Sequence, residues 1–540
     1  MFSRRAYVAI KAETTENTPV LPDQYIGVTA LDIVTQYKYI PSTPILADRN
    51  TRVNPVKGPI DPPQGSLTLQ IEPKKFPNFM KAVFGALTSG VYFPIYQRLF
   101  TGAVTGTPAV GATLSQAVTL ATATVNALVS ATSFDLRDIT IGFDATNLVT
   151  GTNPDGTTFT MTPSATLTSG TFTVGETITG ATSAKTAVVL AVSKELDYLL
   201  VGTLSGTFTA LETISGGSSL KKATLGTYAS TVYGHEAKAP QNSLQTYTVD
   251  VGYENEVIRY MGVRFPAINS LAPKDNIMTA EVGVFARSAF VVGRVLAAVS
   301  AGSSKVVTLD QTQGLTTSDT VKVWRPSTGV FKDLASVGVK TTTITAVSAG
   351  TSVTLGTVTD PLVAGDLLVI APATASYTVG KELPWIGGTV ARIGSTLNET
   401  IAASAASIEE FEAMVVNEME GRHAANEASM GGRFPTANHL KGLHVEGSLK
   451  QAYANPTFID RMRNGTETCL HVVTLGAVIG ATTLYNTIDL RIGRLVFEPF
   501  NPAIEEDALL DLNMSFQAYK DDTSGFTAKM LAINDVASYT

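Results

Sequence analysis

Charged residues are scarce in this chain of 540 residues, of which 16% are Asp, Glu, Lys or Arg, against about a quarter in an average globular protein. The 39 basic and 46 acidic side chains leave a net charge of −7, and no cluster of Lys and Arg stands out. A protein that binds nucleic acid by neutralising its phosphates is therefore disfavoured. A disordered chain is excluded as well, because apolar residues reach 44%.

Cysteine is almost absent, and so are long apolar segments. The single Cys469 cannot form an internal disulfide, so the fold does not depend on an oxidising compartment. The apolar stretch at residues 6–10 is too short for the core of a signal peptide. The longest uncharged stretch, residues 99–134, is broken by Thr, Gly, Gln and Asn. We therefore expect no membrane span and no membrane partner.

The abundant residues are Thr, Ala, Gly, Ser and Val. Valine and threonine favour strands, and the 45 glycines and 25 prolines favour the turns between them. Long helices would need more Glu, Lys, Leu and Arg. The composition therefore predicts a mainly β protein, and the length corresponds to about three to five folded units of roughly 100 to 200 residues each.

Two stretches of the chain match each other without gaps, 382 positions apart (449 − 67 = 382). The matched residues are Gly65, Ser66, Leu67, Phe76 and Met80 in the first stretch and Gly447, Ser448, Leu449, Phe458 and Met462 in the second. After each Gly-Ser-Leu the apolar residues recur at steps of three and four, which is typical of a helix. Pro77 and Pro456 fall where a first helical turn tolerates proline. Each copy is therefore predicted to be a strand that leads directly into a short helix.

A second pair of matches lies further along each copy. The motif at residues 265–268 resembles that at 501–504, 236 positions later (501 − 265 = 236), and a strand is predicted after each motif. In the later copy, apolar residues at 510, 512, 514, 516 and 518 alternate with the polar residues Asp511, Asn513, Ser515 and Gln517. Such strict alternation predicts a strand with one packed face and one face in water.

The two offsets locate an insertion, because the first copy holds 146 more residues between its landmarks than the second (382 − 236 = 146). A motif repeated inside it, at 170–178 and 206–214, indicates a small duplicated β-unit. We predict a first barrel at residues 1–100 and 239–294, an inserted β-module at 101–238, an accessory β-module at 295–373 and a second barrel at 374–540. Insertion points must be exposed, so both modules are expected on the outside.

No set of residues points to catalysis. The five histidines lack the spacing and the Cys or Glu partners of a metal site. No Ser lies in a Gly-x-Ser-x-Gly elbow, and glycine motifs for phosphates or dinucleotides are missing. Trp324 and Trp385 suit carbohydrate-stacking platforms, but isolated tryptophans are more often packing residues. We therefore expect no enzyme activity, no metal and no cofactor.

Several stretches, taken in order, resemble the tail tube protein of long-tailed bacteriophages, the major tail protein that stacks as rings. The stretches are residues 5–20 with 27–29, residues 65–67 with the helix containing Phe76 and Phe79, residues 260–263, residues 432–435, and Gly442 with residues 446–449. They lie outside the two modules and come from both copies. The specificity of the resemblance comes from the order of these stretches.

The resemblance implies two β-sandwich or barrel domains of the tail-tube type, each with a short flanking helix, whose sheets join side by side into a ring. Such rings are hexamers of one-barrel subunits or trimers of subunits with two fused barrels. The repeat favours a homotrimer with pseudo-sixfold symmetry over a hexamer. The rings would stack into a tube in the virion tail, assembled in the host cytoplasm, with other tail proteins at the tube ends.

Two groups of residues are expected to have roles in such a tube. Asp511, Asn513, Ser515 and Gln517 are expected to face the lumen, through which genome DNA passes without specific binding because a net acidic protein does not hold phosphate. The long segments before each Gly-Ser-Leu strand, residues 41–63 and 417–441, are expected to contact the next ring. Their basic residues are Arg49, Arg52, Lys57, Arg422 and Arg433.

Two other classes of protein stay open. The Thr- and Gly-rich modules also suit a surface adhesin or a carbohydrate-binding stalk, which predicts a monomer or a slender trimer with glycan affinity and no tubes. A hydrolase built from β-modules would need a convergent polar cluster, which the sequence does not offer.

Overall fold

The computed structural model describes residues 7–34, 37–42, 54–137, 139, 142–164, 167, 171–193, 197–238, 244–373, 381–394, 408–422, 437–452, 457–499, 511–522 and 525–539. Strands make up 57% of the structure and helices 3%, so the prediction of a mainly β protein is confirmed. The two helices in this described part are α1 (Pro77–Phe84) and α3 (Thr457–Arg463). Each follows a Gly-Ser-Leu strand, as the repeat predicts.

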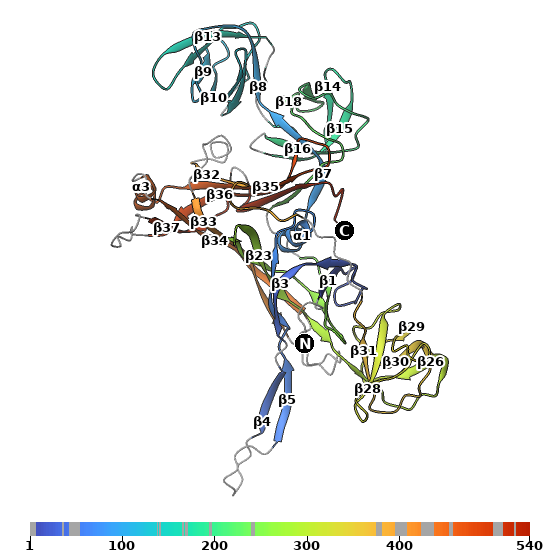
Figure 1. Cartoon of the computed structure of the whole chain (residues 1–540). Helices are drawn as coiled ribbons and strands as arrows, with labels where there is room; N and C mark the ends of the chain where they lie inside the picture. Colours follow the sequence, from blue (N-terminus) through green and yellow to red (C-terminus); the bar gives the residue numbers. More distant parts are fainter. Residues whose placement is uncertain are drawn as a thin grey trace.

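Copy 1, as we name the first repeat, consists of two sheets and α1. One sheet has the order β2-β1-β20-β21-β24 and the other the order β3-β6-β23-β22. The strands are β1 (Tyr7–Ala12), β2 (Gln24–Ile26), β3 (Val28–Val34), β6 (Gln64–Gln70), β20 (Tyr247–Gly252), β21 (Val257–Val263), β22 (Ala267–Lys274), β23 (Ile277–Phe285) and β24 (Ser288–Phe290). Between β3 and β6 the hairpin of β4 (Tyr37–Ser42) and β5 (Asn54–Ile60) extends away from the body of the molecule (Figure 1).

Copy 2 repeats this arrangement. One sheet has the order β32-β35-β36-β38 and the other the order β33-β34-β37, while β36 also pairs with β37. The strands are β32 (Thr389–Gly394), β33 (Ile408–Arg422), β34 (Ala437–Ala452), β35 (Thr468–Val478), β36 (Tyr485–Phe497), β37 (Asp511–Ala518) and β38 (Ala528–Asn534).

The register of the strands is the same in the two copies. Leu67 on β6 lies opposite Val282 on β23, and the matched Leu449 on β34 lies opposite Met514 on β37. On the other side of the same strands, Leu31 pairs with Leu67 and Phe411 with Leu449. Strand pairs that agree residue by residue on both sides of a central strand mark one structural unit used twice.

Steric crowding explains why the repeated Gly-Ser-Leu begins with glycine. A Cβ added to Gly65 would lie 1.6 Å from the carbonyl oxygen of Asp32, and one added to Gly447 would lie 2.2 Å from that of Glu412. Asp32 and Glu412 occupy matching places on β3 and β33. In each copy the neighbouring backbone approaches so closely that any side chain would clash.

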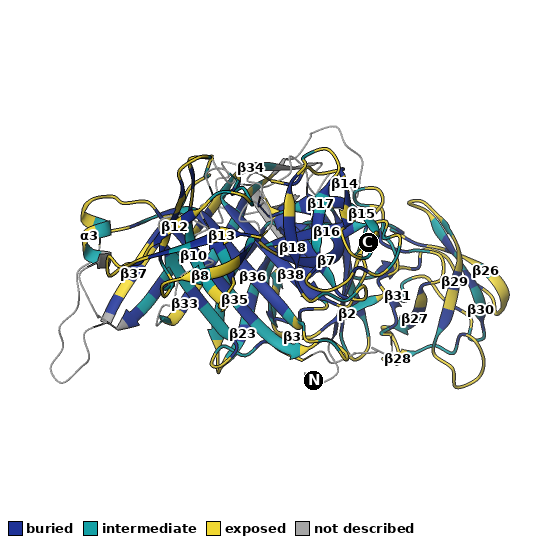
Figure 2. Cartoon of the chain, turned by 90° about the horizontal axis from the view of Figure 1, so that it is seen from above, coloured by how far each residue is buried: buried dark blue, intermediate teal, exposed yellow. Residues whose placement is uncertain are grey.

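The two copies are joined through a strand pair. Strand β22 of copy 1 pairs with β33 of copy 2, with Ile268 opposite Val415 and Leu271 opposite Ala413. Asn417 on β33 is buried, and its amide nitrogen donates hydrogen bonds to the carbonyl oxygens of Val83 at 2.9 Å and Pro266 at 2.8 Å in copy 1. One continuous hydrophobic core runs through both copies, and Figure 2 shows the buried residues along the middle of the molecule.

The insertion, as we name residues 88–238, has two parts (Figure 1). A closed six-stranded barrel with its own core contains β8 (Arg98–Thr105), β9 (Thr113–Gln116), β10 (Ala121–Ser130), β11 (Ser133–Arg137), β12 (Val149–Thr152) and β13 (Thr158–Pro163). The second part contains β7 (Thr88–Tyr96), β14 (Thr177–Gly180), β15 (Thr186–Val192), β16 (Tyr198–Gly202), β17 (Thr213–Gly216), β18 (Lys222–Leu225) and β19 (Tyr233–Lys238). Its strand β19 pairs with both β7 and β38, so the insertion extends a sheet of copy 2.

The motif repeated inside the insertion forms a pseudo-twofold unit. Strands β14 and β17, which carry the two copies of the motif, pair with each other. The carboxylate of Glu176 accepts hydrogen bonds from the Ser219 amide at 2.9 Å and hydroxyl at 2.8 Å, and that of Glu212 accepts the matching bonds from Ser183 at 2.8 and 2.7 Å. Burial raises the pKa of both carboxyls, but these hydrogen bonds outweigh it, and the pKa of each is lowered.

The spacer module, as we name residues 293–370, follows copy 1 and contains β25 (Gly293–Arg294), β26 (Gly302–Thr308), β27 (Thr320–Arg325), β28 (Val330–Phe331), β29 (Thr342–Ser348), β30 (Ser352–Val358) and β31 (Leu367–Ile370). The spacer module contains a type of turn that also occurs in the insertion. Sequence reasoning did not connect the two. In each of these turns an acidic residue follows a residue with positive φ. Its carboxylate accepts a hydrogen bond from the backbone amide of the residue three positions before the acidic residue. The acidic residues are Glu176, Glu212, Asp319 and Asp366.

Each module packs on the sheet of a copy that lies opposite the joined β22–β33 side. The spacer module shares a hydrophobic cluster with Tyr7, Val257 and Met261 of copy 1. The insertion, although it interrupts copy 1, packs on Leu531 and Ile533 of copy 2. In the described part of the chain, the hydrophobic contacts of both modules are therefore with the other sheets and not with the sheet that joins the two copies.

Candidate functional surface

The joined sheet presents one polar face across both copies, in the order β3-β6-β23-β22-β33-β34-β37. Along β6, Leu67 and Leu69 are buried in the core, whereas Ser66 and Thr68 alternate with them and are partly exposed. A similar alternation holds along β33 and β37, whereas a bulge interrupts it on β22 between Ile268 and Ser270. We call the solvent side of these seven strands the polar face.

The residues predicted to face a lumen lie on this surface. Asn513, Ser515 and Gln517 are exposed on β37, and Leu512, Met514 and Phe516, which alternate with them, are buried. Asp511 begins β37 opposite Ala452, but its side chain lies outside the described ones. The alternation predicted for this strand is therefore present, while its place in a channel stays a prediction.

The polar face is acidic. Its described carboxylates are Asp32, Glu281, Glu410, Glu412, Glu418 and Glu446, whereas its described lysines are Lys274 and Lys450. The ammonium of Lys450 lies 3.3 Å from a carboxylate oxygen of Glu410 and is partly neutralised there. A polyanion that approaches this surface therefore meets repulsion over most of its width.

A shallow hollow of about 480 Å³ crosses the same surface where the two copies meet. Ala272 and Pro273 of copy 1 form one side of it, and Ser448 and Asn513 of copy 2 lie opposite. The hollow is therefore lined by strands of both copies on the polar face.

The edges of the joined sheet differ between the copies. Strand β33 is paired along both edges, with β34 on one side and β22 on the other. Its counterpart in copy 1, β3, is paired with β6 along one edge, and Val34 at the end of β3 is 47% exposed. Within the part of the chain that the structure describes, β6 is the strand whose register with β3 is defined, and a strand paired along one edge offers its other edge as a template for a further strand.

The residues predicted to contact a stacked ring belong to the two long hairpins. Lys57 lies on β5 and Arg422 at the end of β33, and the structure places these strands without describing the two side chains. Arg49, Arg52 and Arg433 lie outside the described residues. Their role between rings stays a prediction.

Two of the described histidines, His235 and His471, and the single cysteine are buried. His235 is buried between the Ser89 hydroxyl at 2.8 Å and the side-chain amide oxygen Oδ1 of Asn534 at 3.2 Å, and burial lowers its pKa to about 4. His471 Nε2 lies 2.9 Å from the Asp489 carboxylate. Cys469 is buried and donates to the Gly493 carbonyl oxygen at 2.8 Å. Among the described residues no group of His, Cys, Asp and Glu is arranged to hold a metal ion.

Two buried arginines, which sequence reasoning missed, hold the modules in place. Arg259 of copy 1 is fully buried and contacts Asp250 at 2.7 Å and Asp319 of the spacer module at 2.8 Å. Arg491 of copy 2 contacts Asp489 at 2.7 Å and Asp197 of the insertion at 2.6 Å. The partners in the modules, Asp319 and Asp197, lie 60 and 294 positions away in the sequence, so no local pattern could have revealed these two pairs.

No protein-family model matches this chain, and no curated protein matches it significantly. No helix in the described part of the chain is long and apolar enough to cross a membrane.

Proposed function

We propose that this protein is a structural subunit that forms the tail tube of a long-tailed bacteriophage. Its rings stack into a hollow conduit in the virion tail, and genome DNA passes through the lumen. The observation that carries the proposal is the β22–β33 joint, in which one copy of a repeated unit continues the sheet of the next copy. The same joint, repeated between chains, builds a continuous sheet from many subunits.

The joint is directional, and this direction favours a ring. Copy 1 uses the edge of β22, while copy 2 uses the edge of β33, so the interface joins unlike surfaces. After one such joint, β3 of copy 1 is the counterpart of β33 that still offers an edge. A head-to-tail interface of this kind generates closed rings or open helices, and closure would leave no edge strand exposed to aggregation.

The duplication favours three chains per ring. Each chain carries two copies of the unit in the same register, so three chains supply six equivalent units and a pseudo-sixfold ring. A hexamer of whole chains would instead place twelve units around the lumen. Other tail proteins would bind at the ends of the tube.

The polar face is proposed to line the lumen, with Asn513, Ser515 and Gln517 among its residues. Among the described side chains of this face, six carboxylates stand against two lysines, and DNA phosphates are held by neutralising contacts from Lys and Arg. An acidic lining therefore lets DNA pass without being retained. The spacer module and the insertion, which pack on the opposite sheets, would lie outside the tube.

Ring stacking is proposed to use the two long hairpins, β4–β5 and β33–β34, with the segments that connect their strands. Deletion of residues 50–58 is expected to leave rings that remain soluble and do not stack. Tubes of normal length from this variant would contradict the stacking role.

Negative-stain electron microscopy of the purified chain tests the proposal. We expect rings or tubes of uniform diameter with a central channel. An adhesin or carbohydrate-binding stalk, the alternative class, predicts monomers or slender trimers without a channel at every protein concentration, and that result would overturn the proposal.

A further inference from the structure

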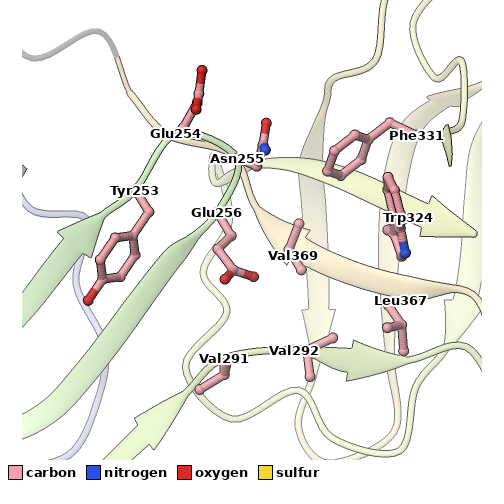
Figure 3. A pocket seen from close by; sticks show the side chains of 10 residues that line it. All are labelled: Tyr253, Glu254, Asn255, Glu256, Val291, Val292, Trp324, Phe331, Leu367 and Val369. Carbon is pink, nitrogen blue, oxygen red and sulfur yellow. The ribbon is translucent and has the colours of Figure 1, made fainter. Parts of the chain in front are cut away.

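A second site lies away from the polar face, where the spacer module meets copy 1. A pocket of about 390 Å³ is bounded by the turn between β20 and β21 and by strands β27, β28 and β31 of the spacer module. Figure 3 shows Trp324 and Phe331 side by side on one wall and the turn that carries Asn255 and Glu256 across from them. The volume lies within the range typical of small-molecule sites.

The two walls of this pocket are held rigidly with respect to each other. The buried Arg259 contacts Asp250 of copy 1 and Asp319 of the spacer module, and its remaining hydrogen-bond donors include one to the Gly314 carbonyl oxygen at 3.0 Å. The Ala373 amide donates to the Tyr7 hydroxyl at 3.1 Å, which ties the end of the module to β1. A pocket between two domains that cannot move apart is preorganised for a ligand.

The lining combines an aromatic wall with hydrogen-bonding groups at the rim. The ring centroids of Trp324 and Phe331 are 4.9 Å apart, with an angle of 67° between the ring planes, and Val292 and Leu367 extend the apolar surface. Glu254, Asn255 and Glu256 contribute carboxylate and amide groups at the opposite side. Both Trp324 and Phe331 are only half-buried, so ring surface remains available to a ligand.

We infer that this pocket binds a neutral carbohydrate, with a sugar ring packed on Trp324 and its hydroxyls hydrogen-bonded by Asn255 and Glu256. A sugar presents an apolar C–H face and a polar hydroxyl rim, and the pocket offers the complementary pair of surfaces. An acidic sugar is disfavoured by the two glutamates. A cationic ligand is disfavoured because the Lys322 ammonium already lies 5.3 Å from the Phe331 ring centroid. The inference does not rest on the proposed tube.

Fluorescence titration of the full chain tests the inference, since the sequence contains two tryptophans. Replacing the other one, Trp385→Phe, leaves Trp324 as the sole indole and is the matched control, because Trp385 packs on Phe411 in copy 2. We expect a saturable emission change with at least one member of a panel of neutral mono- and disaccharides of glucose, galactose, mannose and N-acetylglucosamine. Sialyllactose and choline are the charged comparisons.

Variants then locate the site. Isothermal titration of the saccharide that binds should show binding lost in Trp324→Ala and weakened by about tenfold or more in Glu256→Gln and Asn255→Ala, which remove hydrogen bonds at the rim. Asn255 is in an exposed turn, so its variant keeps the fold even where Trp324→Ala does not. No saturable change with any neutral saccharide, stronger binding of choline or sialyllactose, or unchanged affinity in Asn255→Ala and Glu256→Gln would each overturn the inference.

Discussion

Strands β3, β6 and β23 of copy 1 and strands β33, β34 and β37 of copy 2 pair in the same register, but the two copies differ in what covers them. The β33 edge of copy 2 is paired inside the chain, whereas β3, its counterpart in copy 1, is paired with β6 along one edge. The outer sheet of copy 1 carries the spacer module, and that of copy 2 carries the insertion. The shared framework is therefore the part that assembles, and the differences lie in the edge and in the attached modules.

The comparison between the copies is tested most strongly at their matched glycines. We expect Gly65→Ala to lower the free energy of unfolding by about 4 kcal/mol and Gly447→Ala by about 3 kcal/mol, because each new Cβ meets a backbone carbonyl. Urea unfolding measures both. Gly442→Ala, on the same strand as Gly447 but with its nearest neighbour at 3.8 Å, is the matched control and should change little. Equal, small effects in all three variants would contradict the shared close approach.

The two module anchors are expected to differ in strength. Arg259→Met leaves Asp250 and Asp319 buried without their partner and should cost roughly 3–5 kcal/mol. Arg491→Met should cost less, because the side chain of its partner Asp197 is 26% exposed. Hydrogen exchange should show the spacer module loosened in the first variant and the insertion in the second. The triple variant R259M/D250N/D319N should recover part of the loss; an unchanged or larger loss would argue against a buried-charge effect.

The joint between the insertion and copy 2 should depend on pH through His235. Its folded pKa is lowered by burial to about 4, below the unfolded value near 6.5. The folded state therefore binds fewer protons, so stability is full above about pH 6.5 and falls by up to about 3 kcal/mol as the pH approaches 4. Thermal unfolding across this range checks it, and His235→Gln should flatten the profile. A profile that stays equally steep in that variant would assign the effect to other groups.

The smallest loss of stability is expected for a substitution at the joint between copy 1 and copy 2. Asn417→Ala removes two buried side-chain hydrogen bonds to copy 1, while the backbone amide of residue 417 still donates to the Pro266 carbonyl oxygen, so the substitution should cost about 1–3 kcal/mol. Asn513→Ala on the exposed polar face is the control and should stay within about 0.5 kcal/mol. Chemical denaturation compares the two variants. A loss at Asn513 as large as that at Asn417 would contradict the assigned faces.

The sequence predicted those features that leave a local or periodic trace. The strand and helix after each Gly-Ser-Leu were predictable because the spacing of Leu67, Phe76 and Met80 recurs at Leu449, Phe458 and Met462, and the alternating face of β37 was predictable from its period of two. The β22–β33 joint and the anchors of Arg259 and Arg491 were not predictable, since they join residues far apart in the chain. The turns at Asp319 and Asp366 were not connected with those of the repeated motif at Glu176 and Glu212, because the four instances share an acidic residue and the positive φ before it rather than the residues around them.

The most direct test of the central claim is the number of chains in one ring, measured by native mass spectrometry of rings released from the assembled protein. With a chain mass of 56.8 kDa, the account predicts a ring of three chains (3 × 56.8 = 170.4 kDa). Rings of six chains, or a monomer at every concentration, would contradict the proposal that the intrachain joint of the two copies is repeated between chains.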